Sequence, residues 1–249
     1  MKLAWLKNYN LLEFETIDST NSEALRAAKS ETADCVIISE RQTGGRGSKG
    51  RTWVSIAGNL HMSILLNFPR DFKRHSSLSF LTANAMYSTL AGMFGERKLS
   101  CKIELKWPND VLINGKKVAG TLLESISVNE KTFIVIGVGV NIIEAPGAVA
   151  FPSTSLYDEG VETGAMEFMQ VLMQKFDKLY RKFLYEKDFT NIRKDWLRRA
   201  YNLNKIITIN DGVKEISGTF IGIDLEGAIM LRLASGEIFS FVQGDVLDI

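Results

Sequence analysis

A glycine-rich basic stretch, GGRGSKGRTW at residues 44–53, is the part of the chain best suited to chemistry. Four basic side chains and no acidic one lie between Arg41 and Arg51. Successive backbone N–H groups in a glycine-rich turn can form an anion site, which fixed positive charges strengthen. Trp53 closes the stretch with a flat face that could cover a base. An anion that carries a base describes a nucleotide; on composition alone, a solvated basic loop is the alternative.

The same stretch matches two phosphate-binding motifs, and both fail on their context. Residues 45–50, GRGSKG, fit the G-x-G-x-x-G pattern, and residues 45–52 miss the P-loop pattern by having arginine where lysine belongs. Both motifs hold phosphates at the N-terminus of a helix that the loop opens. Here a tryptophan, two β-branched residues and a Gly58-Asn59 turn follow instead. We therefore expect an anion-binding loop that opens no helix.

A second unusual stretch, KWPND at residues 106–110, ends a strand-like run. It combines a tryptophan, a proline that cannot donate to a ladder, an amide and a carboxylate, and Lys116 and Lys117 follow it. Loops after strand ends are common ligand sites, although such a segment alone could be a simple turn. The glycine-rich stretch and the KWPND stretch therefore share three features: a flexible backbone, positive charge and a nearby side-chain amide.

The sequence offers no partners for a nucleophilic catalytic set. His61 lies in a strand pattern and is expected to be a packed histidine, whereas His75 is expected in a polar loop. A site of this composition stabilises charge with preorganised donors rather than with a nucleophilic side chain. Cys35 and Cys101 lie far apart without metal-ligand spacing, so we expect two buried free thiols.

Hydrophobic patterns outline the elements that must position these residues. Strands are expected at 35–40, 60–68, 102–107 and, centrally, 131–142, with helices at about 21–29, 77–94 and 164–184. Residues 111–126 are expected to form a hairpin that turns at Asn114-Gly115, and Ser19 or Asp18 to cap the first helix. From about Leu203 onward, short strands about ten residues apart predict a small barrel.

Length and charge set outer limits. The chain has 249 residues and a formal net charge of +1. That length allows one substantial core and a small second domain, and the balanced charge gives no global attraction to nucleic acid or acidic membranes. No signal-peptide pattern and no apolar run of membrane-spanning length is found, so we expect a cytoplasmic protein without a membrane partner.

Four motifs together resemble those of the biotin–protein ligases. They are DSTN (18–21), RQTGGRGSKGRTW (41–53), KWPNDVLINGKKVAG (106–120) and IGVGVN (136–141), in this order, and the resemblance covers about residues 14–249. It implies an α+β fold: a central mixed β-sheet with helices, like the catalytic domain of class II aminoacyl-tRNA synthetases, plus a small C-terminal SH3-like barrel. The expected domains are residues 1–202, which bind biotin and ATP, and residues 203–249, the barrel.

The resemblance also implies an activity and its substrates. Members of this family are ATP-dependent biotin–[acetyl-CoA-carboxylase] ligases, which use ATP and Mg²⁺ to convert biotin to biotinyl-5′-AMP. They then transfer biotin to one lysine of a biotin carboxyl carrier protein. The acceptor amine attacks the mixed anhydride itself, so no protein nucleophile is needed.

Site residues follow from the same resemblance, position by position. Arg46 and Lys117 are the expected catalytic residues, and no metal ligand is expected among the side chains. Biotin is expected to meet Ser19, Thr20, Asn21, Gln42, Arg46, Gly47, Ser48, Lys117 and Gly120. ATP or the adenylate is expected to meet Gly45, Arg46, Arg51, Trp53, Lys106, Asn109, Lys117 and Asn141.

Two departures from the family pattern have consequences. The family loop usually reads GRGRxGR, and in this chain Ser48 takes the place of its second arginine. Because one cation is missing, we expect the adenylate to be released from the site and to label lysines indiscriminately, unless Lys49 or Arg51 compensates. Only 17 residues precede Asp18, too few for a helix-turn-helix domain. We therefore expect the short form of the ligase, without a DNA-binding domain.

Two rival functions remain open from the sequence. A lipoate or octanoate ligase is similar in fold, but the GRG loop, the KWPND and KKVAG segments and the barrel favour biotin. A nucleic-acid-binding module would use residues 41–51 and the basic helical region 175–199, which has nine Lys/Arg against four Asp/Glu. The barrel, with three basic and seven acidic residues from Lys205 onward, argues against phosphate binding. A homodimer through an exposed sheet edge is possible, and we expect the loop 44–53 to be mobile without ligand.

Overall fold

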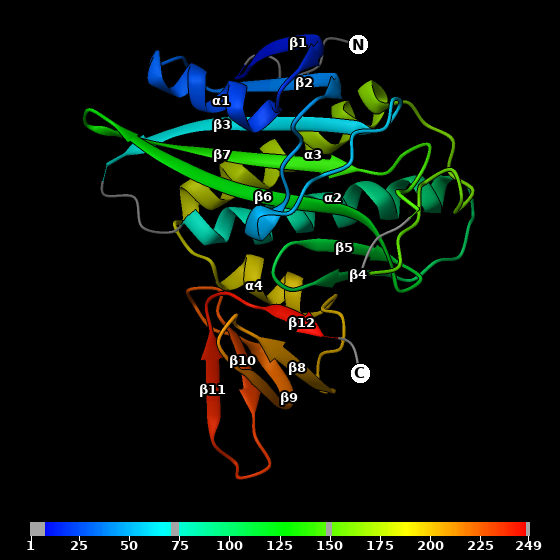
Figure 1. Ribbon diagram of the computed structural model, residues 1–249, viewed down its shortest axis with the longest axis vertical. Helices are drawn as coiled ribbons and strands as arrows, with labels where there is room; N and C mark the ends of the chain where they lie inside the picture. The colour runs from blue at the N-terminus through cyan, green and yellow to red at the C-terminus, as the bar shows by residue number, and fades with distance from the viewer. Residues whose placement is uncertain (1–7, 71–74, 148–150, 248–249) are drawn as a thin grey trace.

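The computed structural model describes residues 8–70, 75–147 and 151–247. Figure 1 shows a large twisted sheet with helices on both faces and a smaller sheet beyond its β4–β5 end. The helices are α1 (Thr20–Lys29), α2 (His75–Glu96), α3 (Ala165–Glu186) and α4 (Thr190–Leu197). The strands of the large sheet are β1 (Asn10–Ile17), β2 (Cys35–Gln42), β3 (Leu60–Pro69), β4 (Ile103–Lys106), β5 (Asp110–Ile113), β6 (Lys116–Val128) and β7 (Lys131–Val140).

The large sheet is mixed, as expected for an α+β fold of this family. Its seven strands follow the order β1-β2-β3-β7-β6-β5-β4. β1 and β2 pair in parallel, and the other neighbours pair antiparallel. The 131–142 segment was predicted as a central strand, and β7 confirms it by pairing with β3 and β6 over its whole length. The β5–β6 hairpin turns at Asn114 and Gly115, whose φ angles of 51° and 77° confirm the predicted turn.

The two faces of this sheet bury different clusters. In β2, Val36 and Ile38 belong to the large core that includes side chains of α2 and α3. Cys35 and Ile37 point the other way and pack against alanines of α1. This alternation is the period of two that a strand buried on both faces requires. Because α1 has only ten residues, it covers part of its face and leaves the remainder available for a binding site.

The smaller sheet contains the strands β8 (Ile206–Asn210), β9 (Glu215–Ile223), β10 (Ile229–Arg232), β11 (Ile238–Phe241) and β12 (Asp245–Leu247). Its order is β11-β10-β9-β8-β12, and every pairing is antiparallel. This is the C-terminal antiparallel domain that the spacing of short strands predicted. The domain boundary at Leu203 stays a prediction.

Direct contacts, one of them buried, join the small sheet to the large domain. The Trp107 indole N–H donates to the Gly227 carbonyl over 3.0 Å, so the KWPND segment reaches into the small domain. The Ser76 hydroxyl, in the first turn of α2, donates to the Glu226 carbonyl over 2.8 Å. A side chain at Gly227 would collide with the Phe80 ring, 2.5 Å from an ideal Cβ, so only glycine allows this close approach.

Several local predictions need correction. α1 begins at Thr20, and Ser19 is its N-cap residue. The Ser19 side chain, however, makes no capping hydrogen bond. His75 begins α2 instead of lying in a polar loop. Cys35 is buried as expected, but Cys101 is only half-buried. Sequence patterns also missed β1 and β12, and they included α4 only within the basic helical region 175–199. In the described part of the chain, no helix is long and apolar enough to cross a membrane.

Candidate active site

The predicted motifs converge on one cavity of about 410 Å³. This volume lies in the usual range for small-molecule sites. The predicted site residues that line it are Ser19, Thr20, Asn21, Gln42, Arg46, Gly47, Ser48, Arg51, Trp53, Asn109, Lys117, Gly120 and Asn141. Gly45 and Lys106 are absent from the lining found among the described residues. The structure therefore brings together segments that lie more than a hundred residues apart in the chain.

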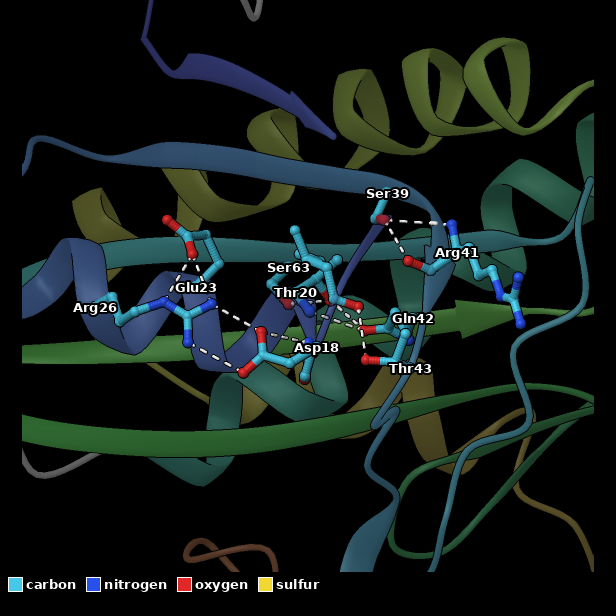
Figure 2. Close-up of polar contacts among 11 residues, drawn as sticks. Asp18, Thr20, Glu23, Arg26, Ser39, Arg41, Gln42, Thr43 and Ser63 are labelled. Carbon is cyan, nitrogen blue, oxygen red and sulfur yellow. Dashed lines mark hydrogen bonds and ion pairs between the residues drawn. The ribbon is translucent and has the colours of Figure 1, made fainter. Parts of the chain in front are cut away.

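A cluster of small polar side chains forms one end of the cavity. Gln42 Oε1 accepts hydrogen bonds from the Thr20 backbone N–H over 2.8 Å and from the Thr20 hydroxyl over 3.2 Å. Ser63 Oγ, in β3, lies 2.8 Å from Thr20 Oγ1 and 2.5 Å from Asn21 Oδ1. Figure 2 shows Thr20, Gln42 and Ser63 turned toward one another. Ser63 was not predicted, although a serine inside the apolar run 60–68 is a signal that could have found it.

An ion pair fixes the start of α1, and with it this cluster. Arg26 lies 2.7 Å from the Asp18 carboxylate and also pairs with Glu23. Figure 2 shows Arg26 between these two side chains. The hydrogen bond from Arg26 lowers the pKa of Asp18 to about 2. Asp18 also accepts from the Ser19 backbone N–H over 2.8 Å. The first residue of the DSTN motif therefore orients the turn that presents Thr20 and Asn21.

The glycine loop is a compact hairpin-like turn that contains one 3-10 turn, Ser48–Gly50, and opens no α-helix, as predicted. The Gly47 N–H donates to the Arg51 carbonyl over 2.7 Å, and the Trp53 N–H donates to the Gly45 carbonyl over 3.0 Å. An ideal Cβ on Gly45 would lie 2.5 Å from the Trp53 carbonyl oxygen, so this position requires glycine for a backbone contact. Gly45 thus shapes the loop without lining the cavity.

Each cation of this loop meets an acidic partner from a distant segment. Arg46 lies 2.7 Å from Glu124 of β6. Lys49 and Arg51 lie 3.0 and 3.2 Å from the Asp245 carboxylate of β12. These partners were not predicted, because the loop itself has no acidic residue. The mobility expected of the ligand-free loop stays a prediction, and these three ion pairs are contacts that would oppose it.

Ser48, the residue that departs from the family pattern, takes part in the same anchoring. Its hydroxyl accepts a hydrogen bond from the Arg51 guanidinium over 2.9 Å, and its carbonyl accepts another over 3.2 Å. Arg51 therefore reaches back over the position where the family usually has arginine. Its guanidinium supplies charge beside Ser48.

Alternate glycines of β7 form a flat floor for two site residues. An ideal Cβ on Gly139 would lie 2.3 Å from the Trp53 indole, and one on Gly137 would lie 2.3 Å from Asn21 Oδ1. Side chains at either position would displace these residues. The IGVGVN motif thus combines glycines that face the cavity with Ile136 and Val140, which belong to the core; Val138 belongs to the core and also lines the cavity.

The KWPND segment supplies an amide and a carboxylate. Asn109 Nδ2 donates to the Thr121 carbonyl over 2.5 Å, and Asp110 lies 2.7 Å from Lys117 Nζ. The Lys117 ammonium also lies 5.7 Å from the centre of the Trp53 ring. Lys106, the lysine that begins the KWPND segment, is buried behind the cavity wall. Its Nζ lies 3.6 Å from the centre of the Phe151 ring. Lys106 therefore supports the lining residue Phe151.

Asn141 faces the cavity from the end of β7 and is itself held in place. Its side-chain amide donates to the Thr154 carbonyl over 3.1 Å. The Leu156 backbone N–H donates to the Asn141 carbonyl over 3.0 Å. This asparagine therefore connects the cavity to the segment that carries Phe151 and Ser153, two more lining residues.

The titratable groups expected to be inert are buried without catalytic partners. His61, in β3, is 1% exposed, and burial lowers its pKa, which confirms a packed histidine. Burial also raises the pKa of the Cys35 thiol to about 11, so this thiol is unreactive. Within residues 8–70, 75–147 and 151–247, no group of three or more His, Cys, Asp or Glu side chains could hold a metal ion. The arrangement stabilises negative charge through fixed donors.

Comparisons with known proteins identify the family. Residues 13–141 match the Biotin/lipoate A/B protein ligase family, and residues 203–247 match the Biotin protein ligase C terminal domain. The chain is 38% identical over 226 residues to the biotin–[acetyl-CoA-carboxylase] ligase of Paracoccus denitrificans, covering 88% of this chain and 92% of that protein.

Further relatives agree in sequence and fold. A bifunctional ligase/repressor of Bacillus subtilis is 30% identical over 241 residues, which are 91% of this chain and 70% of that protein. The solved structure of a biotin protein ligase from Aquifex aeolicus with biotin and ATP superposes with a TM-score of 0.80 at 26% identity, covering 96% and 97% of the two chains. Family match, identity and fold point the same way: this chain belongs to the biotin protein ligase family.

Proposed function

We propose that this protein is an ATP-dependent biotin–protein ligase, which forms biotinyl-5′-AMP and transfers biotin to a lysine of a biotin carboxyl carrier protein. One observation carries the proposal: a single cavity joins a neutral cluster of hydroxyls and amides to the fixed cations Arg46 and Lys117. These are the two surfaces that a carboxylate-bearing ureido compound and a nucleotide need. The relatives in sequence are named as enzymes of this kind.

The neutral cluster would bind the biotin head group. A ureido ring presents N–H donors and a carbonyl acceptor, which require matched acceptors and donors in a shielded pocket. Ser19, Thr20 and Asn21 supply hydroxyl and amide groups, and Gln42 orients Thr20. Gly120 leaves room beside Lys117, whose Nζ would lie 3.3 Å from an ideal Cβ there. A larger residue at this position would narrow the cavity.

The cations would lower the barrier to activation. Biotin presents a carboxylate to the α-phosphate of ATP, and these two anions repel each other unless positive charge neutralises them. Arg46, the Gly47 backbone and Lys117 line this part of the cavity. Removing one preorganised donor of this kind typically costs about 3–4 kcal/mol of transition-state stabilisation. Arg46 and Lys117 are therefore the proposed catalytic residues.

The nucleotide would occupy the side of Trp53 and Asn109. The indole lies flat on β7 and could cover the adenine, while Asn109 and Asn141 would fix the ribose-phosphate end. Arg51 and Ser48 would close the loop over the phosphate. Gly45 and Lys106 would act indirectly, through loop shape and through Phe151.

Mg²⁺ would enter with the ATP phosphates. Asp110 is the one carboxylate among the described residues that line the cavity, and Lys117 is its partner. Magnesium is commonly bound by one or two carboxylates together with substrate phosphates, which this donor set fits. Asp110 is the side chain that would add a protein ligand.

The transfer step would need no nucleophile from the protein. The neutral acceptor lysine amine attacks the carbonyl carbon of biotinyl-5′-AMP and the new C–N bond forms. AMP leaves with the electron pair of the broken C–O bond, and the nitrogen releases one proton to water. The same cations that favour adenylate formation would stabilise the charge on the departing AMP. This accounts for a site built from donors and cations.

The competing functions have weaker support. The relatives in sequence are biotin ligases, which favours biotin over lipoate or octanoate. In the basic region 175–199, Arg181, Lys182 and Arg198 pair with acids one helical turn away, as solvated helix faces do. A nucleic-acid function is therefore not proposed. The edge strand β1 could pair two copies of the chain, so a homodimer remains a proposal.

A transfer assay tests the proposal. The purified protein is incubated with biotin, MgATP and a biotin carboxyl carrier protein domain, and the mass of the product is measured by mass spectrometry. We expect one biotin on one lysine, and no product with an acceptor whose target lysine is replaced by arginine. An acceptor that stays unmodified while a lipoyl domain is acylated by lipoate would contradict the choice of biotin.

A further inference from the structure

Glu124 occupies an unusual position between the two halves of the cavity. One of its oxygens, Oε2, accepts from the Arg46 guanidinium over 2.7 Å and from the Asn21 side-chain amide over 2.7 Å. Asn21 is buried, at 4% exposure, and its oxygen receives the Ser63 hydroxyl. One carboxylate therefore links the neutral cluster to the first cation of the glycine loop.

The carboxylate acts from behind the two residues that it holds. Asn21 and Arg46 line the cavity, whereas Glu124 is absent from the lining found among the described residues. A guanidinium has five N–H donors, and the contact with Glu124 uses one terminal nitrogen of Arg46. The remaining donors of Arg46 are left for an anion inside the cavity.

The same contact fixes the orientation of the Asn21 amide. The Asn21 Nδ2 also donates to the Leu122 carbonyl over 3.4 Å. Both groups of β6 that it contacts, this carbonyl and the Glu124 carboxylate, are therefore hydrogen-bond acceptors. The amide nitrogen must therefore face β6 and the amide oxygen must face Ser63. A ligand that binds Asn21 meets an amide whose two ends are already assigned.

We propose that Glu124 is a positioning residue that sets the biotin affinity of this site by orienting Asn21 and Arg46 together. The inference rests on the proposed function. Asn21 would meet the ureido ring, and Arg46 would meet the biotin carboxylate. Glu124 thereby couples recognition of the head group to recognition of the carboxylate, without touching the ligand.

The energetics separate this role from a purely structural one. The side chains of Arg46 and Glu124 are 41% and 26% exposed, and ion pairs at such partly exposed positions stabilise a fold little. Ligand binding is more sensitive, because the charge-assisted hydrogen bonds of an arginine depend on the fixed geometry of its guanidinium. Loss of the charge should therefore affect biotin binding far more than it affects unfolding.

Glu124→Gln tests this inference, with Glu130→Gln as its matched control. Glutamine has the same shape and keeps an acceptor oxygen for Asn21, but it lacks the charge that holds Arg46. Glu130 is a carboxylate just after the same strand, 91% exposed and 3.7 Å from Arg70. Biotin binding is measured by calorimetry without ATP, steady-state constants by pyrophosphate–ATP exchange, and stability by thermal unfolding.

We expect the dissociation constant for biotin to rise roughly tenfold in Glu124→Gln, with a melting temperature within about 3 °C of the wild type. Glu130→Gln should match the wild type in both. Unchanged biotin affinity in Glu124→Gln would overturn the inference. So would a weakened biotin affinity that the lower stability of the variant explains in full. A wild type that shows no biotin-dependent exchange would instead overturn the proposed function.

A double-mutant cycle provides a second, independent measurement. If Glu124 acts through Arg46, Glu124→Gln should weaken biotin binding less in an Arg46→Gln background than in the wild type. The remaining effect reports the part that acts through Asn21. The effects on the free energy of biotin binding could instead be fully additive, both for Glu124→Gln with Arg46→Gln and for Glu124→Gln with Asn21→Ala. That result would contradict positioning through these residues.

Discussion

Arg46 and Lys117 each have a carboxylate partner within the protein. Glu124 and Asp110 lie 2.7 Å from these two cations. A cation that exchanges one anion for another gains only the difference between two ion pairs. We therefore expect moderate ground-state affinity for ATP, with the larger electrostatic gain where negative charge develops during the reaction.

Ser48 allows a direct test of how tightly the adenylate is held. Ser48→Arg would add a cation at the cavity wall, and a hydrogen bond from such a charge contributes about 1.5 kcal/mol, or roughly tenfold in release. We expect labelling of a bystander protein, normalised to labelling of the carrier domain, to fall by about that factor. The measurement is quantitative mass spectrometry after incubation with biotin and MgATP. Equal bystander labelling by both proteins would show that Arg51, held by Ser48, already compensates.

His61 should make stability depend on pH. Burial lowers its pKa in the folded protein below the ordinary value of 6.5. Above that value the imidazole is neutral in both states; below it the unfolded chain binds the proton first, so the free energy of unfolding falls as pH falls. The slope for one proton is at most about 1.4 kcal/mol per pH unit.

His61→Phe removes this titration and keeps an aromatic ring. Urea unfolding at pH 7.5 and pH 5.5 should show a smaller loss of stability for the variant than for the wild type. Identical losses would mean that other groups carry the acid dependence. Activity should change little, since His61 is absent from the lining among the described residues.

At the residue scale, the sequence predicted the types of groups in the site but not their partners. Arg46, Lys117 and Trp53 stand out because cations, glycines and a tryptophan gather in short stretches. Glu124 and Asp245 do not stand out, because each is one acid among many. Their role depends on long-range packing, which no local pattern encodes.

At the element scale, the short strand β12 connects the small domain to the glycine loop. Asp245 pairs with both Lys49 and Arg51. Asp245→Asn removes the charge that holds them, so we expect trypsin to cleave the ligand-free loop severalfold faster. The pairs are partly exposed, so each contributes only about 0–1 kcal/mol and global stability should change little.

Glu237→Gln is the matched control for this prediction. Glu237 is an exposed carboxylate between β10 and β11 of the same domain. Its variant should be cleaved at the wild-type rate. A loop equally protected in Asp245→Asn and in the wild type would show that the backbone hydrogen bonds of Gly47 and Trp53 suffice to hold it.

The elements that sequence patterns predicted are those with long apolar runs or a clear turn. β3, β7 and α2 are long and apolar, and β5–β6 is marked by its Asn114-Gly115 turn. β1 pairs on one side only and exposes several positions, and β12 has three residues. Such short or half-exposed elements carry too few apolar residues to stand out.

At the scale of the whole molecule, the small domain contacts segments that frame the site. Trp107 donates to Gly227 of the small domain, and the loop cations reach Asp245 of the same domain. The four motifs predicted one site, because their order resembles a known family. How the small domain contacts that site could not be predicted, since these contacts join side chains to backbone groups in distant turns.

Pyrophosphate–ATP exchange tests the central claim most directly. The purified protein is incubated with MgATP, labelled pyrophosphate and, in separate reactions, biotin, lipoate or octanoate. We predict exchange with biotin alone, because the neutral cluster fits a ureido ring and the cations fit a carboxylate beside a phosphate. Exchange with lipoate or octanoate and none with biotin would contradict this account, as would a protein that exchanges with none of the three.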